Sequence, residues 1–354
     1  MSIYFAGLDK GVLIGNGAFG TVHKCVDPVF GEVAGKFIFA NKFPDPNAWL
    51  AAKNKSLSEA KKLGALEHPN TVRVFGVLAH PTDAEFLISC EFCGAGSARD
   101  VCKTNLVSLV SAKSIVRDAA IGLSFIHSNG YIHRDVKPDN VLLCDNGRAK
   151  VGDFGFVTDA LQFGFATPYG TPVYWAPEVF QSKVCSPQSD VYSLGATLLH
   201  LVCGEQWFFR VNNQPLIGVN AVGHQFIKEN PLFLPHLPKD WRTKIAKLLR
   251  HNPARRCVSM SEAVDLVSRL GQIENWQCQV GPNEITWKLE GPKRRVCVVW
   301  SDYFKSASAW TAWSEDLGGA KKRTLATGGT GQGKWRIAYR SLQSFFQVRT
   351  DRIK

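Results

Sequence analysis

The chain has 354 residues, more than one ordinary domain requires, and 45% of them are hydrophobic, which is enough to build a sizeable core. No run approaches the roughly 18 to 20 apolar residues that a membrane span needs, and the first residues lack the charged and apolar regions of a signal peptide. The ten cysteines form no paired framework, so we expect a soluble, cytoplasmic protein with reduced thiols.

The first motif in chain order is a glycine-rich stretch at residues 15–20. It follows an apolar run, Val12-Leu13-Ile14, and precedes another strand-like stretch rather than a helix. A lone GxGxxG is a weak signal, and a dinucleotide-binding fold would require a helix directly after it. The strand context favours a glycine hairpin instead, in which the missing side chains let the backbone approach phosphate groups closely.

The most specific stretch runs from His133 to Asn140 and is rich in charge, although strand-like residues flank it on both sides. After Asn140 come a short strand, an Asp-Asn-Gly turn and a return strand that leads to Asp153. A hairpin of that length returns Asp153 to the side of Asn140, where a carboxylate and an amide oxygen can hold Mg²⁺. Asp135 can then face the acceptor, as a base or orienting group for a hydroxyl.

With Phe154 and Gly155 directly after Asp153, these residues resemble the signature of the eukaryotic-type serine/threonine protein kinase family. The similarity runs from about residue 8 to about residue 271. It implies an α+β, two-lobed kinase fold, with a small β-rich N-lobe at residues 1–93 and a larger helical C-lobe at residues 94–271. It also implies phosphoryl transfer from MgATP to Ser or Thr hydroxyls of protein substrates.

The resemblance assigns roles in the catalytic site. Lys36 would reach the α- and β-phosphates of ATP, and Glu59, on a helix expected from about Asn47 to Leu66, would pair with it. The alternative is that Glu59 is one exposed helix charge among several. Lys137 would contact the transferred phosphate, and Thr171 would orient the catalytic aspartate. The catalytic set implied is Asp135, Lys137, Lys36, Asn140, Asp153 and Thr171, with Asn140 and Asp153 as the Mg²⁺ ligands.

The segment from Phe86 to Cys93 resembles the hinge between the two kinase lobes, with Cys90 at the gatekeeper position and the backbone of Glu91 and Cys93 in line for the adenine edge. Cys90 and Cys93 form a CxxC pair, but no second ligand pair lies nearby, which disfavours a metal site. The ATP-binding residues implied by the resemblance are Ile14, Gly15, Asn16, Gly17, Ala18, Phe19, Gly20, Val22, Ala34, Lys36, Glu59, Glu91 and Cys93.

Residues 170–178 resemble the end of an activation segment and its Ala-Pro-Glu platform for protein substrates. The resemblance pairs Glu178 with Arg256 in a buried bridge, and Arg255 stays open as an alternative partner. It places Asp190 under the catalytic loop, the stretch from His133 to Asn140. There Asp190 would bond the loop backbone. A helix N-cap is the other interpretation of Asp190.

Regulation is suggested by Arg134, which lies beside the catalytic aspartate and is a ready partner for a phosphate. Thr167 stands where many family members carry that phosphate. We expect Thr167 to be phosphorylated, by a second copy in a transient homodimer. The alternative is that the segment folds by packing of its aromatic residues alone.

Two rival functional classes are disfavoured. A catalytically dead kinase fold that serves as a scaffold would be expected to have lost Lys36, Asp135 or Asp153, and all three are present. A kinase for a small molecule would be expected to lack the Ala-Pro-Glu features.

Residues 276–354 predict a third, small β-rich domain. They contain 14 Lys plus Arg against 6 Asp plus Glu, two thirds of the chain's net charge of +12, and six of the ten tryptophans. Alternating runs at 285–289, 296–300 and 335–339 predict strands. Basic residues interleaved with aromatics fit an acidic protein segment or nucleic acid, whereas the alternative is that the tryptophans simply form the core.

Residues 328–334 match the GxxxxGK pattern of a second nucleotide site. Trp335 stands where that motif needs a Ser or Thr for Mg²⁺, and we expect a strand rather than a helix to follow. The stretch is therefore interpreted as a hairpin loop.

Overall fold

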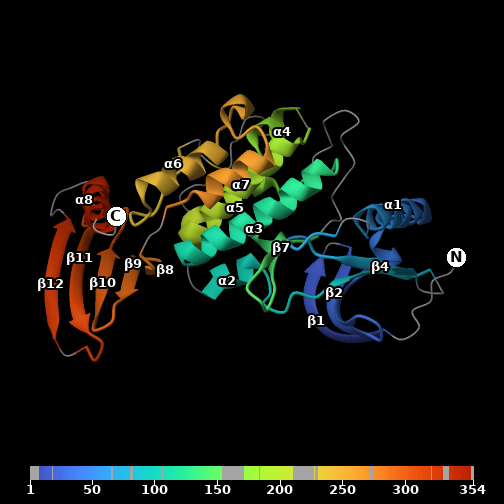
Figure 1. The fold of residues 1–354 in the computed structure, drawn as a ribbon, viewed down its shortest axis with the longest axis horizontal. Helices are drawn as coiled ribbons and strands as arrows, with labels where there is room; N and C mark the ends of the chain where they lie inside the picture. Colours follow the sequence, from blue (N-terminus) through green and yellow to red (C-terminus); the bar gives the residue numbers. More distant parts are fainter. Residues whose placement is uncertain are drawn as a thin grey trace.

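The computed structural model describes residues 8–17, 19–64, 67–79, 83–104, 107–153, 171–182, 184–209, 227, 230–271, 274–319, 321–329 and 335–351. Within these ranges the side chains of Gly17, Lys55, Glu59, residues 61–63, Thr104, Thr350 and Asp351 are not described. A β-rich lobe, a helical lobe and a second β-sheet follow one another along the longest axis, from right to left in Figure 1.

The N-lobe is a five-stranded antiparallel sheet with the order β1-β2-β3-β5-β4. Its interior is built by buried residues of alternating strand positions, among them Val33, Phe37 and Leu87. The helix expected at residues 47–66 is present as α1. The elements are β1 (Asp9–Gly17), β2 (Gly20–Asp27), β3 (Gly31–Phe39), α1 (Pro46–Gly64), β4 (Val74–Ala79) and β5 (Glu85–Glu91).

The helical lobe is organised around α5 (Pro187–Trp207), which is buried along almost its whole length. Ser186 caps this helix, since its side chain accepts a hydrogen bond from Ser189 N. The sheet lobe and this helical lobe confirm the expected α+β, two-lobed fold. The other elements are α2 (Ala98–Thr104), α3 (Leu109–Ser128), β6 (Val141–Leu143), β7 (Ala149–Val151), α4 (Pro177–Ser182), α6 (Lys239–Leu248) and α7 (Met260–Ser268).

The C-terminal part is a five-stranded antiparallel sheet with one helix packed on it (Figure 1). Trp287, Trp300 and Trp310 share its inner face, and α8 covers that face through contacts such as Trp287 with Phe346, whose ring centroids are 5.3 Å apart. The strands expected at 285–289 and 296–300 are present. The elements are β8 (Gln277–Val280), β9 (Glu284–Glu290), β10 (Arg294–Ser301), β11 (Ala309–Asp316), β12 (Lys322–Gly329) and α8 (Trp335–Asp351).

The strand predicted at residues 335–339 is wrong, because this stretch begins α8. Ala338, Leu342 and Phe346 are buried at a spacing of four residues, which is the period of one helix face. The apolar and polar residues of a five-residue window fit a strand and a helix equally well. Only a longer window distinguishes the two structures. The expectation that a strand follows the GxxxxGK stretch is wrong for the same reason. Residues 330–334 of that stretch lie outside the described part.

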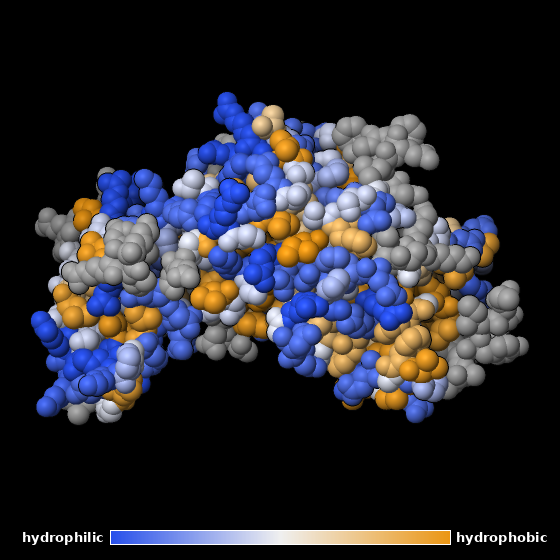
Figure 2. All heavy atoms as spheres, viewed as in Figure 1, coloured by the Kyte–Doolittle hydropathy of each residue, from blue (hydrophilic) through white to orange (hydrophobic). Residues whose placement is uncertain are grey.

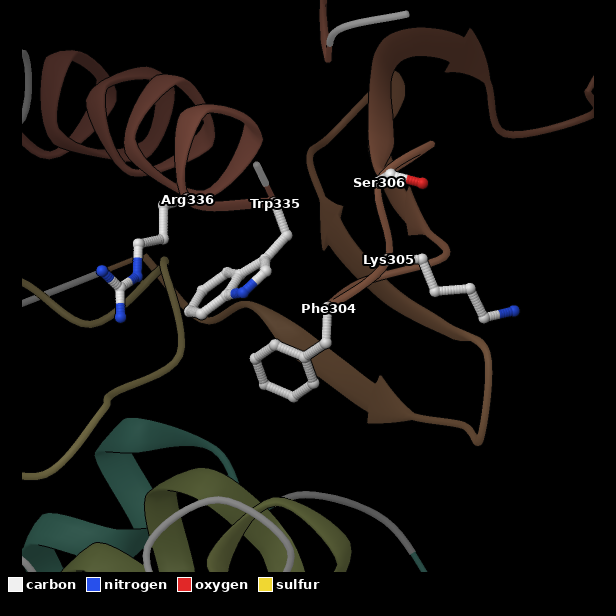
Figure 3. A pocket seen from close by; sticks show the side chains of 5 residues that line it. All are labelled: Phe304, Lys305, Ser306, Trp335 and Arg336. Carbon is white, nitrogen blue, oxygen red and sulfur yellow. The ribbon is translucent and has the colours of Figure 1, made fainter. Parts of the chain in front are cut away.

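The C-terminal sheet continues the core of the helical lobe. Trp207, the last residue of α5, packs against Trp300, Tyr303 and Phe304, with ring centroids 6.3, 6.0 and 5.3 Å away. Phe304 in turn meets Trp335 of α8 edge to face at 4.8 Å, and both rings line a surface pocket (Figure 3). We therefore propose that residues 276–354 fold together with the helical lobe rather than as an independent unit.

No helix in the described part of the chain is both long enough and apolar enough to cross a lipid bilayer.

Replacing Trp207 by Ala should lower the free energy of unfolding by about 3–5 kcal/mol, because a fully buried indole leaves a cavity that its neighbours cannot fill. Urea unfolding followed by circular dichroism measures the loss. Trp313→Ala is the matched control. Trp313 lies on the C-terminal sheet, on the face opposite to Trp300 and Trp310, and is only partly buried. Equal losses in the two variants would contradict a shared core.

Candidate active site

A buried carboxylate fixes the backbone of the catalytic loop. Asp190, in the first turn of α5, accepts hydrogen bonds from His133 N at 2.8 Å, Arg134 N at 2.9 Å and His127 Nε2 at 2.8 Å. Burial alone would raise the pKa of Asp190, but these bonds and the nearby imidazoles hold it below its ordinary value. The helix cap is Ser186, so the capping interpretation of Asp190 does not apply.

The carboxylate of Asp135 lies among three hydrogen-bond donors. Its Oδ1 accepts from Thr171 N at 2.9 Å, and its Oδ2 accepts from Asn140 Nδ2 at 2.9 Å and lies 2.8 Å from Lys137 Nζ. Lys137 Nζ also donates to Thr171 Oγ1 at 2.7 Å. The structure therefore brings together four residues that are up to 36 positions apart, and only 3% of Asp135 is exposed.

The hairpin of β6 and β7 places Asn140 beside Asp153. Val141 pairs with Val151, and Gly152 N donates to Asn140 O at 2.9 Å. The amide nitrogen of Asn140 is used twice, by the backbone and side-chain oxygens of Asp135. Its oxygen is the atom that suits a hard cation, as is the Asp153 carboxylate. These two residues would supply the oxygen ligands that a Mg²⁺ ion takes.

An ion pair of Lys36 with Asp153 joins the N-lobe to the helical lobe. Lys36 Nζ lies 2.6 Å from Asp153 Oδ1. Burial would raise the pKa of Asp153, but the ion pair with Lys36 outweighs it and holds this pKa low. Burial would likewise lower the pKa of Lys36, and the carboxylate raises it above its ordinary value. Both groups are therefore charged. The side chain of Glu59, the expected partner of Lys36, is outside the described part, although its backbone belongs to α1.

The glycine-rich stretch forms the hairpin of β1 and β2, with Gly15 opposite Val22 and Gly17 opposite Gly20. Strands on both sides exclude the dinucleotide context, which needs a helix. At Gly20 a side chain would collide with Phe37 O, which lies 1.8 Å from the Cβ position. Phe19 stacks on Phe43 at 5.1 Å, and Ala18 lies outside the described residues.

The hinge after β5 is attached to the β6–β7 hairpin. Glu91 accepts two hydrogen bonds of 2.6 Å from Lys150 Nζ, and Ala95 N donates to Leu143 O at 3.1 Å. Cys93 Sγ lies 3.5 Å from Cys144 Sγ. Ala34 of β3 pairs with Cys90, so an expected ATP-binding residue and the expected gatekeeper are strand neighbours.

Glu178 is bound by Arg256, and Arg255 is not its partner. Arg256 Nη1 and Nη2 reach the two carboxylate oxygens of Glu178 at 2.7 and 3.0 Å, and the Arg256 side chain is fully buried. The same guanidinium donates to backbone oxygens of Gln188 and Arg250. This bidentate geometry joins α4 to the segment before α7.

Sequence analysis missed several supporting residues. Arg99 of α2 bonds Asp139 Oδ1 at 3.1 Å and Glu205 Oε1 at 2.9 Å, which ties the catalytic loop to the end of α5. His127 and Lys150 were missed as well. These residues stand in no motif, and their partners lie far away in the sequence, so single-sequence patterns give no signal for them. Phe154, Gly155 and Thr167 were predicted as site residues but lie outside the described part.

Residues 8–266 match the model of the protein kinase domain, which covers more than half of the chain. The chain belongs to the protein kinase family.

Three relatives show how much of the chain is similar to known protein kinases. A probable serine/threonine-protein kinase of Dictyostelium discoideum is 32% identical over 251 residues, covering 70% of this chain and 48% of the relative. The serine/threonine-protein kinase PknB of Mycolicibacterium smegmatis is 29% identical over 291 residues, 78% of this chain and 44% of the relative. The serine/threonine-protein kinase MST20 of Pyricularia oryzae is 30% identical over 228 residues, which cover 61% of this chain and 25% of the relative. The chain spans about half or less of the length of these relatives.

Replacing Arg256 by Met should reduce the free energy of unfolding by about 3–5 kcal/mol, because the Glu178 carboxylate and the backbone oxygens around it lose their buried partner. Chemical denaturation measures the change. Arg255→Met removes the same charge from the preceding residue, which is exposed. It should lower the free energy of unfolding by no more than about 0.5 kcal/mol. The assignment of the bridge fails if the Arg255 variant is the less stable of the two.

Proposed function

We propose that this chain is an ATP-dependent protein kinase that phosphorylates Ser or Thr hydroxyls of protein substrates. The observation that carries the proposal is the arrangement around Asp135, whose carboxylate is held by Thr171 N and lies 2.8 Å from Lys137 Nζ. Membership of the kinase family and the names of the relatives support it.

The mechanism assigns each group a task in an in-line transfer of the γ-phosphoryl group. Asp135 orients the acceptor hydroxyl and accepts its proton. Lys137 neutralises charge on the transferred group, and Lys36 does so on the α- and β-phosphates. Bound Mg²⁺ would neutralise the phosphates further, held by oxygens of Asn140 and Asp153. Little of this is covalent chemistry, so the protein contributes position and charge.

Binding of ATP is proposed for the cleft between the lobes. The β1–β2 hairpin would cover the phosphates, with Gly15 and Gly17 allowing close approach, and Ala34 and Val22 would pack against the base. Backbone groups of Glu91 and Cys93 would receive the adenine edge. The ion pair of Lys36 with Asp153 places opposite charges where phosphates and Mg²⁺ are expected.

Regulation by a phosphate on Thr167 is proposed because Arg134, one residue before Asp135, is a buried cation within the catalytic loop. A phosphate dianion brought to Arg134 would order the activation segment through charge-assisted hydrogen bonds. A second copy of the chain, in a transient homodimer, would supply the phosphate.

The C-terminal domain is proposed to recruit an acidic protein segment. Hydrophilic residues gather at the outer end of its sheet, where β12 begins (Figure 2), and Lys322 and Arg323 are exposed there. The tryptophans favour the core interpretation, because Trp287, Trp300 and Trp310 are buried and so cannot stack on bases. The burial of these three tryptophans, which removes their faces from stacking, therefore favours an acidic protein over single-stranded nucleic acid.

Replacing Asp135 by Asn should lower kcat by about 10²–10⁴-fold while the KM for ATP stays nearly constant, because the amide keeps the shape but cannot accept the proton. Transfer of labelled phosphate from MgATP to a generic basic protein measures both values. Asp240→Asn makes the same chemical change at an exposed position on α6 and serves as the control. Full transfer by the Asp135 variant would exclude the proposed chemistry.

Replacing Thr167 by Ala should reduce activity roughly tenfold, the loss expected when one charge-assisted hydrogen bond no longer orders a segment. Mass spectrometry after incubation with MgATP should find phosphate on Thr167 of the wild-type chain. Thr158→Ala, in the same segment, is the control. Full activity of Thr167→Ala together with an unmodified Thr167 would favour packing alone.

A further inference from the structure

Two thiols meet where the hinge contacts the β6–β7 hairpin. Cys93 lies in the hinge after β5, and Cys144 closes the turn of the β6–β7 hairpin. Their Sγ atoms are 3.5 Å apart, although 51 positions separate them in the sequence, and both cysteines are free thiols. Contact between the two segments extends to the next residues, because a Cβ on Gly94 would lie only 2.7 Å from Asp145 Oδ1.

We propose that Cys93 and Cys144 form a reversible disulfide, which makes this pair an oxidative modification site that controls ATP binding. Its effect on ATP rests on the proposed kinase function, whereas the bond itself does not. A disulfide has an S–S length of about 2.03–2.05 Å, so the two sulfurs must approach by roughly 1.5 Å. The hinge and the hairpin already lie side by side, so this approach needs only a local shift.

The two thiols differ in accessibility, and this sets the order of events. Cys144 is partly exposed, whereas 7% of Cys93 is exposed. Burial, followed by the neighbouring Cys144 thiol, raises the pKa of the Cys93 thiol. Cys144 is therefore the sulfur that meets an oxidant first, and Cys93 is the resolving thiol.

The oxidant is a hydroperoxide. The Cys144 thiolate attacks one peroxide oxygen, the O–O bond breaks, and a sulfenic acid forms while the other oxygen leaves as water. The Cys93 sulfur then attacks the sulfenic sulfur, the S–S bond forms, and the hydroxyl group leaves with the Cys93 proton as a second water. Two thiols lose two electrons in total, and one hydrogen peroxide is reduced to two waters. A small thiol reverses the reaction by exchange.

The contacts that hold the two ends of the hinge determine how the disulfide would affect ATP binding. Lys150 fixes Glu91 at one end, and Leu143 fixes Ala95 and Gly96 at the other. The shift that the disulfide requires is therefore concentrated at Cys93 and Gly94, in the middle. The backbone of Cys93 is the proposed partner of the adenine edge, so its displacement weakens ATP binding. Oxidation should raise the KM for ATP several-fold.

The experiment treats the full chain with hydrogen peroxide, blocks the remaining thiols, and digests it with trypsin without reduction. Cys144 falls in the peptide of residues 135–148, and Cys93 falls in the peptide of residues 74–99, which also contains Cys90. Fragmentation of the linked peptide identifies which cysteine is joined. The KM for ATP is measured before oxidation, after oxidation, and after reduction with dithiothreitol.

We expect a Cys93–Cys144 link, a several-fold higher KM, and recovery of both on reduction. Cys144→Ser should keep the KM of the reduced protein and lose the response to peroxide. Cys297→Ser, which removes a thiol from the C-terminal sheet, should respond as the wild type does. A link between Cys90 and Cys93 instead, or a normal peroxide response of Cys144→Ser, would overturn the proposal.

The two proposals fail separately. If the reduced protein transfers no phosphate, the kinase function is wrong, yet the linked peptide can still be found. If the reduced protein is an active kinase and no linked peptide appears at peroxide levels that oxidise other thiols, only the disulfide is wrong.

Discussion

The catalytic loop depends on the carboxylate of Asp190. Arg134 has a φ of 69°, a left-handed conformation that costs a residue with a side chain roughly 1–2 kcal/mol. Asp190 offsets this cost, because an ionised carboxylate with three donors forms hydrogen bonds stronger than neutral ones. The left-handed turn at Arg134 lets the next residue, Asp135, meet Thr171 N and Lys137 Nζ. Strain at one residue and burial of one charge thus position Asp135, the proposed catalytic group.

Helix α5 carries this constraint across the molecule. Asp190 stands at its first turn, and Glu205, which follows a kink at Gly204 (φ 76°), holds Arg99, which reaches back to Asp139 beside Asn140. The catalytic loop is therefore attached to α5 at two points about 15 residues apart. Trp207 follows immediately and packs into the aromatic core of the C-terminal sheet. The C-terminal domain consequently supports the helix that supports the loop.

The sequence predicted most of the site because its residues stand in short, ordered stretches. The length of the turn between Asn140 and Asp153 was enough to place them side by side, since a two-stranded hairpin has few alternatives. Long-range support was not predictable: Arg99, His127 and Lys150 bond partners that no local pattern indicates. At Gly35 the missing side chain leaves room for Cys25 Sγ, 2.9 Å from the Cβ position, which is a property of packing between strands. The helix at 335–351 was mistaken for a strand because the window was shorter than two helical turns.

The ion pair of Lys36 and Asp153 bears on how the proposed ATP site would receive a polyanion. In the structure each charge neutralises the other at 2.6 Å, and about a third of each side chain is exposed. Exposure keeps the net strength of such a pair small, because water screens it. Under the proposed function, a triphosphate with its metal ion would offer each group a stronger partner, because Lys36 would gain phosphate oxygens and Asp153 would gain a divalent cation. The screened ion pair would then be exchanged for these partners at little cost.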